Sequence, residues 1–140
     1  MAEERANGQL KGLVISDDDE TVDTISSAIE ISWPHCILSY ATSEEKGMAL
    51  AGSETPAFIV LDLALNDSGI FKTAGKLSRL NNSALIVLSR STHNESELIE
   101  SLDNGADEYI SKPIRQMEFL ARLRNSIQRK QTEVTKGAKA

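Results

Sequence analysis

Four mainly apolar segments of this chain each end in polar residues that could take part in chemistry. The polar residues are Asp17, Asp18, Asp62, Ser89 and Lys112. Carboxylates that lie close together repel one another unless a proton or a cation lies between them. Carboxylate oxygens suit Mg²⁺, and a lysine with a hydroxyl group can hold the oxygens of a phosphoryl group. In such a set the carboxylate of Asp62 could attack phosphorus and form an acyl phosphate.

The segment that ends in Asp62 is the most informative of the four. Its residues 58–61 are all apolar, Pro56 precedes them, and the turn-forming residues 66–69 follow. An uninterrupted apolar run of this length predicts a strand buried on both faces. An acid at the end of such a strand lies at the edge where open parallel sheets bind ligands.

The rest of the chain alternates between predicted strands and predicted helices. The strands are predicted at 13–16, 36–41, 58–63, 84–89 and 109–113. The helices are predicted between Glu20 and Trp33, over 42–51 with Gly52 as its stop, over 70–80, over 95–103 with Gly105 as its stop, and over 117–129. Fivefold alternation predicts an α/β fold, a five-stranded parallel sheet with helices on both faces. The polar strand ends should therefore meet at one edge of the sheet.

Length and composition place the chain among ordinary globular domains. Its 140 residues suit one domain, and its net charge of −6 argues against direct nucleic acid binding. Cys36 is the only cysteine, which excludes an internal disulfide and fits a reducing cytoplasm. No apolar run is long enough to span a membrane, and the first residues do not resemble a signal peptide. A cytoplasmic location is the resulting expectation.

Each polar residue also has an ordinary interpretation when it is taken alone. Asp62 could initiate a turn or cap a helix, and Asp19 is expected to be the N-cap of the first helix. Lys112 could be a solvated surface charge, and Ser89 an isolated hydroxyl at a strand end. The functional interpretation is favoured because these groups occur together at matching strand ends.

The order and spacing of several motifs resemble the receiver domain of two-component response regulators. The motifs are the acids after the first strand, Leu61-Asp62-Leu63, Leu88-Ser89, Gly105-Ala106-Asp107-Glu108-Tyr109 and Lys112-Pro113. The resemblance implies a flavodoxin-like (βα)5 three-layer sandwich. It also implies a receiver domain over 11–130, preceded by a disordered leader over 1–10 and followed by a flexible tail or linker over 131–140.

The resemblance implies a role for each site residue. Asp62 would be the phosphoacceptor, with Ser89 and Lys112 as its catalytic partners. Mg²⁺ would be the cofactor, and Ser89 and Tyr109 would form the switch; Pro113 would follow a peptide bond that is often cis. The implied metal ligands are Asp17, Asp18, Asp62 and the backbone of Ala64, and of the acidic pair Asp18 is favoured over Asp17 as the direct ligand. An ordinary half-buried tyrosine is an equal alternative for Tyr109.

The implied partner is a sensor histidine kinase or a phosphotransfer protein. The segment after Lys112 looks most like receivers attached to winged-helix transcription regulators, which predicts a phosphorylation-favoured homodimer. The residues of that face are Asp107, Glu108, Arg115 and Arg122. A solvated basic helix face is the alternative, since exposed ion pairs are individually weak. The few residues after Arg129 are too short for a DNA-binding domain, so we expect a stand-alone receiver or a piece of a longer regulator.

Three positions depart from the family pattern. Asn66 stands where a proline is usual, in a loop that looks shortened; Arg90 follows Ser89 where a very small residue is usual; and the connection from Ser89 to Gly105 looks longer. Arg90 could narrow access to the site or contact phosphate. These departures leave open a rival function, a phosphorylation-independent pseudo-receiver that acts as a protein-interaction module.

Two other functions on a similar fold are disfavoured. An aspartyl phosphatase normally has a second acid two residues after its nucleophile, and Ala64 is at that position. A flavin- or nucleotide-binding module needs a Ser/Thr/Gly-rich phosphate loop after the first strand. The acidic run 17–20 at that place would repel phosphate in the absence of a metal.

Overall fold

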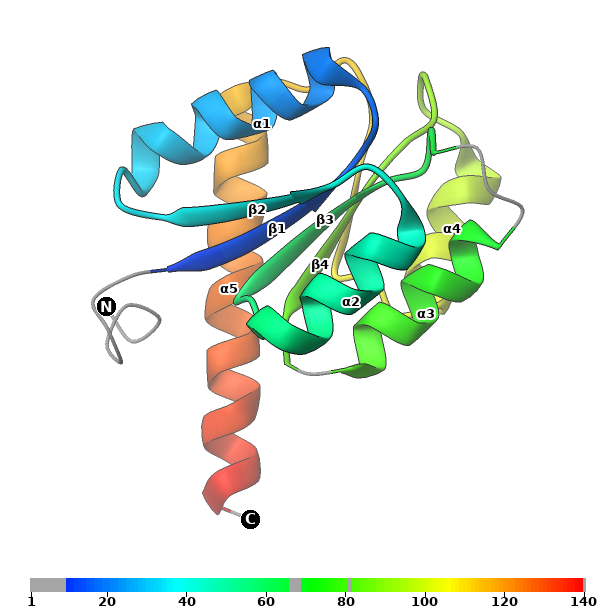
Figure 1. Ribbon diagram of the computed structural model, residues 1–140. Coiled ribbons are helices and arrows are strands. Elements are labelled where there is room, and N and C mark those ends of the chain that lie inside the picture. Colours follow the sequence, from blue (N-terminus) through cyan, green and yellow to red (C-terminus); the bar gives the residue numbers. More distant parts are fainter. Residues whose placement is uncertain (1–9, 66–68, 81, 140) are drawn as a thin grey trace.

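One five-stranded parallel sheet forms the centre of the computed structural model, which describes residues 10–65, 69–80 and 82–139, with side chains to 133 (Figure 1). The strand order is β2-β1-β3-β4-β5. The strands are β1 Lys11–Ile15, β2 Ile37–Ala41, β3 Phe58–Asp62, β4 Ala84–Leu88 and β5 Glu108–Ile110. The predicted α/β class and parallel sheet are confirmed.

Five helices complete a three-layer sandwich. They are α1 Asp19–Ser32, α2 Glu44–Glu54, α3 Ile70–Leu80, α4 Glu95–Asp103 and α5 Gln116–Lys139. Helices α1 and α5 pack together on one face of the sheet, and α2, α3 and α4 lie on the other (Figure 1). Helices α3 and α4 have the predicted bounds, and Gly105 has the positive φ of 104° expected after a helix end.

Two apolar cores separate the layers because successive strand residues point to opposite faces. Val14, Val60 and Ile86 pack in the core beneath α1 and α5. Leu61 and Val87 pack in the opposite core, beneath α2 and α3. All five residues of β3 and of β4 are buried. These two strands are therefore enclosed by the two cores, and Asp62 and Ser89 lie at their carboxyl ends.

Helix α2 begins and ends at other residues than the sequence predicted. Its N-cap is Ser43, whose side chain accepts a hydrogen bond from the backbone N–H of Lys46, so the predicted start at Thr42 is wrong. The helix also continues past Gly52 to Glu54, where Thr55 ends it in the left-handed conformation at φ 43°. A glycine within a helix is tolerated at a modest energetic cost, so it did not act as a stop here.

Helix α5 is longer than predicted, since it continues past Arg129 to Lys139 (Figure 1). The Lys130 ammonium lies 3.5 Å from Asp107 Oδ1, and the Lys130 carbonyl accepts a hydrogen bond of 3.1 Å from Asn82 Nδ2. These contacts connect the first residue beyond the predicted end of the helix to the body of the domain. Within the described residues, no helix combines the length and the apolar character needed to cross a membrane.

Candidate functional site

The Asp62 carboxylate is fully buried at the end of β3 and is held by three hydrogen-bond donors. Its Oδ1 accepts from Lys112 Nζ at 2.8 Å and from the backbone N–H of Ala64 at 2.9 Å. Its Oδ2 accepts from Ser16 Oγ at 2.7 Å. Burying a charged carboxylate is costly unless it is paired and hydrogen-bonded, so these donors account for its stability there.

Ser16 is a site residue that the sequence analysis did not single out. It follows β1, and the register of β1 against β3 pairs Ile15 with Leu61, which places Ser16 opposite Asp62. The side chain is buried, and its Oγ also accepts a hydrogen bond of 3.2 Å from the backbone N–H of Asp18. Aligning the ends of the two predicted strands would have identified this neighbour of Asp62.

The three acids after β1 have different positions. Asp18 is the N-cap of α1, and its Oδ2 accepts from the backbone N–H of Thr21 at 3.1 Å and from the Thr21 hydroxyl. These hydrogen bonds from Thr21 lower the pKa of Asp18. The prediction that Asp19 is the N-cap is therefore wrong. Asp17 is exposed between Ser16 and the cap, and metal binding by Asp17 or Asp18 stays a prediction.

Ser89 links the end of β4 to the loop that carries Lys112. The serine is fully buried, and its Oγ donates to the carbonyl of Ser91 at 3.1 Å and accepts from the backbone N–H of Lys112 at 2.8 Å. The Lys112–Pro113 peptide bond is cis, as the resemblance implied. The structure thus brings Asp62, Ser89 and Lys112 to one edge of the sheet, as expected from the strand order.

Tyr109 is largely buried and is fixed by helix α4. Its hydroxyl donates to Glu97 Oε1 at 3.0 Å, with the carbonyl of Asn94 at 3.4 Å. Burial raises the pKa of the Tyr109 hydroxyl, and the hydrogen bond to the Glu97 carboxylate raises it further. Glu97 is itself buried, and the sequence analysis did not identify it.

Arg90 contacts Glu97. Its Nε lies 3.0 Å from Glu97 Oε2, and its backbone N–H donates to Glu97 Oε1 at 3.3 Å. Glu97 therefore connects the residue after Ser89 to the hydroxyl of Tyr109.

A known protein family matches most of the chain, including Asp62, Ser89 and Lys112. The sequence model of the response regulator receiver domain matches residues 13–124. The chain belongs to the response regulator receiver family.

Transcription regulators are among the relatives of this receiver. It is 32% identical over 117 residues to the transcriptional regulatory protein KdpE of Mycobacterium tuberculosis, which covers 84% of this chain and 50% of KdpE. It is 30% identical over 129 residues to the transcriptional regulatory protein AfsQ1 of Streptomyces coelicolor, which covers 90% of this chain and 55% of AfsQ1. The receiver thus spans about half the length of these regulators.

Solved structures share its fold. A CheY-like receiver domain from Methanospirillum hungatei superposes with a TM-score of 0.78 at 21% identity, covering 89% of this chain and 98% of that one. A response regulator from Burkholderia pseudomallei with a phosphorylated aspartic acid, a calcium ion and citrate superposes with a TM-score of 0.72 at 25% identity. That match covers 89% of this chain and 72% of the other.

The donor set of this receiver fits Mg²⁺ as a site of few carboxylates. Across residues 10–65, 69–80 and 82–139, no three His, Cys, Asp or Glu side chains are grouped so that they could hold a metal ion. Mg²⁺ is commonly held by one or two carboxylates together with water and phosphate oxygens. The carboxylates available for such a site are that of the buried Asp62 and that of the exposed Asp17, which follows Ser16 in the chain.

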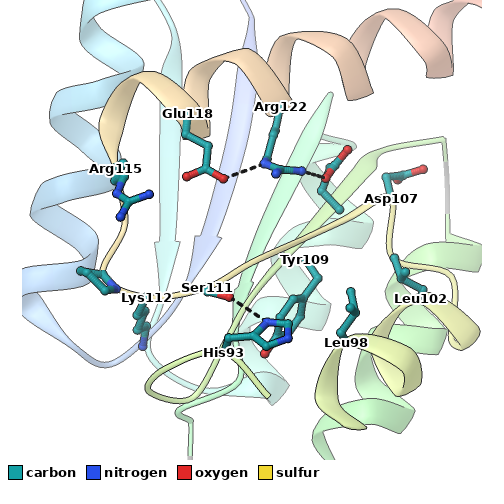
Figure 2. A pocket seen from close by; sticks show the side chains of 12 residues that line it. His93, Leu98, Leu102, Asp107, Tyr109, Ser111, Lys112, Arg115, Glu118 and Arg122 are labelled. Atoms are coloured by element: carbon teal, nitrogen blue, oxygen red, sulfur yellow. Dashed lines mark hydrogen bonds and ion pairs between the residues drawn. The ribbon is translucent and has the colours of Figure 1, made fainter. Parts of the chain in front are cut away.

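A pocket of about 570 Å³ opens on the surface formed by α4, β5 and α5, which we call the α4–β5–α5 face (Figure 2). Arg122 lies on α5 and bonds within the chain to Glu108 at 2.8 Å and to Glu118 at 3.0 Å. Arg115 is exposed beside the pocket. Asp107 accepts a hydrogen bond from the backbone N–H of Leu85 at 2.7 Å. The predicted dimer residues thus share one face. Both acids among them, Asp107 and Glu108, already have partners in the same chain.

Proposed function

We propose that this receiver accepts a phosphoryl group on Asp62 from the phosphohistidine of a sensor histidine kinase or a phosphotransfer protein. The proposal places it in the cytoplasm as a signalling switch. The observation that supports this most is the ion pair of 2.8 Å between Lys112 Nζ and Asp62 Oδ1 in a buried position. A fixed ammonium beside a strand-end carboxylate suits a reaction in which charge develops on phosphoryl oxygens.

The transfer forms one bond and breaks another. An oxygen of Asp62 bonds to phosphorus while the P–N bond to the histidine ring breaks. The imidazole takes the bonding electron pair and leaves neutral, because its other nitrogen carries a proton. Lys112 orients Asp62 and neutralises charge on the phosphoryl oxygens.

Asp17, Asp62 and the backbone carbonyl of Ala64 are the groups that we propose as ligands for Mg²⁺. The capping bonds from Thr21 to Asp18 argue against a direct ligand role for that carboxylate. When bound, the ion supplies positive charge to the transferring oxygens.

The proposed switch involves Ser89 and Tyr109. The Ser89 hydroxyl now donates to a neutral carbonyl, that of Ser91. A phosphoryl oxygen on Asp62 would be a stronger, charged acceptor, so Ser89 would turn toward it. That movement would change the packing beside Tyr109 and thereby bias the α4–β5–α5 face.

The α4–β5–α5 face is proposed to bind a second copy of the chain after phosphorylation. Helix α4, with the sequence ESELIESLD, carries acids and no bases, whereas the exposed Arg115 lies directly before the first residue of α5. Large apolar side chains are also exposed there, namely Ile99, Leu102 and Met117. An isologous pairing would bring acidic α4 of one copy toward Arg115, at the start of α5, of the other.

Light scattering tests the dimer. We expect the protein treated with beryllofluoride and Mg²⁺ to dimerise and the Arg115→Glu variant to stay monomeric. Arg79→Glu, at an exposed position on α3, makes the same charge change away from the face and should dimerise normally. Equal dimerisation of all three proteins would refute the proposed face.

Intact-mass measurement tests the phosphorylation. Incubation with acetyl phosphate and Mg²⁺ should add one phosphoryl group to the wild type and none to Asp62→Asn. If neither acetyl phosphate nor a panel of histidine kinases adds a phosphoryl group, the chain would instead be a phosphorylation-independent interaction module. The observation that favours this second function is that the Asp62 carboxylate is buried and that both of its oxygens accept hydrogen bonds.

The output is proposed to be transcriptional control. KdpE and AfsQ1 are named as transcriptional regulatory proteins, and this receiver matches about half of each. Helix α5 extends beyond the sheet and would connect the receiver to a DNA-binding domain in such a protein (Figure 1).

A further inference from the structure

The two oxygens of Asp62 have different surroundings. Oδ1 already accepts from the Lys112 ammonium and from the Ala64 amide, whereas Oδ2 accepts from the Ser16 hydroxyl. A hydroxyl donor is neutral and is displaced at a lower cost than an ammonium. A cation would therefore bind Oδ2 of Asp62, and it would compete for this oxygen with the Ser16 hydroxyl.

The Ser16 hydroxyl is well held in this position. It donates to Asp62 Oδ2 at 2.7 Å and accepts from the backbone N–H of Asp18 at 3.2 Å. The residue is 2% exposed, so water does not readily replace it. The second of these hydrogen bonds connects Ser16 to the start of helix α1, because Asp18 is the N-cap of that helix.

Apart from the exposed Asp17, the neighbouring acids give little compensation for a neutral residue at position 16. Asp18 is occupied by its bonds from Thr21, and the described residues contain no group of three potential metal-binding side chains. The attraction of a divalent cation grows with each carboxylate that faces it. A hydroxyl beside Asp62 thus leaves the resting site with less negative charge than a carboxylate would.

We propose that Ser16 is a positioning residue that weakens the binding of Mg²⁺ to the resting receiver by holding Asp62 Oδ2. Tight binding of the ion then requires the oxygens of a phosphoryl group. The inference rests on the proposed function, because it concerns the same carboxylate. It makes metal binding and phosphoryl transfer strongly linked events in this receiver.

Isothermal titration calorimetry with Mg²⁺, and electron paramagnetic resonance with Mn²⁺, measure the affinity directly. We expect Ser16→Ala to bind the ion about threefold more tightly than the wild type, since the competing donor is gone. We expect Ser16→Asp to bind about tenfold more tightly, since it also adds a charge. Ser27→Asp, at an exposed position on α1, adds the same charge elsewhere and should bind like the wild type.

Circular dichroism shows whether the Ser16→Asp variant, with its buried substitution, is folded. If it is not, Ser16→Ala alone tests the proposal. Binding by Ser16→Ala that equals the wild type, or is weaker, would overturn the inference. Adding Asp62→Asn to Ser16→Ala should abolish the gain; a gain that persists would overturn it as well.

Phosphorylation by acetyl phosphate distinguishes a failure of this inference from a failure of the proposed function. A wild type that is phosphorylated, with no gain in Ser16→Ala, would refute only the role of Ser16.

Discussion

The hydroxyl of Tyr109 and the carboxylate of Glu97 lie 3.0 Å apart, and the same carboxylate pairs with Arg90. Tyr109 belongs to β5, and Glu97 to α4. The proposed switch aromatic is therefore tied to a helix of the proposed output face by a buried charged acceptor. Hydrogen bonds to charged acceptors are stronger than those to neutral ones, so Glu97 should set how readily Tyr109 moves.

Replacing Glu97 with glutamine should lower the pKa of Tyr109. Burial is the main cause of the raised pKa, and the hydrogen bond and charge of Glu97 add to it. Without the carboxylate, the phenol should ionise closer to its ordinary value of about 10. Ultraviolet titration in a Tyr40→Phe background, which leaves Tyr109 as the only tyrosine, measures this directly. An unchanged titration curve in Glu97→Gln would show that Glu97 does not act on the phenol.

Replacing Asp18 with alanine should destabilise the domain by about 1 kcal/mol, because helix α1 loses its N-cap. Asp18→Asn should retain most of the stability, since asparagine is also a good cap. Urea unfolding monitored by the fluorescence of the single, buried Trp33 compares the variants. Equal losses in the two variants would contradict the capping role.

The advantage of the native Asp18 over asparagine at the same position should also depend on pH. Folding lowers the pKa of Asp18, so its carboxylate contributes stability above the pKa of the unfolded chain. That contribution is lost as the pH falls through the lower pKa of the folded protein. The wild type and Asp18→Asn should therefore converge in stability between near-neutral pH and about pH 3. Parallel urea unfolding curves across this range measure the difference, and a constant gap would contradict the titration of Asp18.

The sequence was sufficient to predict the fold and the meeting of Asp62 with Lys112. Both follow from strong, local signals: uninterrupted apolar runs that predict strands, and polar residues at their carboxyl ends. Parallel strand order then brings those ends to one edge. The geometry of Asp62 and Lys112 is a consequence of topology, so no side-chain detail was needed to predict it.

The positions of Asp18 and Glu97 depended on contacts that local patterns do not specify, whereas Ser16 could have been found by aligning the ends of the predicted strands. Among the consecutive acids 17–19 the sequence analysis assigned the cap of α1 to Asp19, but the turn geometry makes Asp18 the cap. Glu97 lies in a polar stretch of α4, and its burial results from a tertiary contact with Tyr109. The end of α5 was similarly missed, and the contact of Lys130 with Asp107, in the loop before β5, is a tertiary contact that the local pattern did not indicate.

Cys36 should react slowly with thiol reagents while the protein is folded. Burial raises the pKa of its thiol to about 11, and the thiolate is the reactive form. At about pH 8 the folded protein should contain roughly two orders of magnitude less thiolate than the unfolded chain, whose pKa is about 8.5. Labelling with a chromogenic disulfide in buffer and in urea tests this. Similar rates in both would show that the thiol is not shielded.

Replacing Lys112 with methionine should destabilise the domain by about 3 kcal/mol, because the substitution leaves the Asp62 carboxylate buried without its cation. The methionine keeps a similar volume, so lost packing contributes little. Asp62→Asn in the Lys112→Met background should recover much of the loss, since the amide carries no charge that needs a partner. Urea unfolding of the wild type, both single variants and the double variant gives the coupling free energy. A coupling near zero would mean that the two groups do not stabilise each other, and it would remove the main support for Lys112 as the partner of the phosphoacceptor.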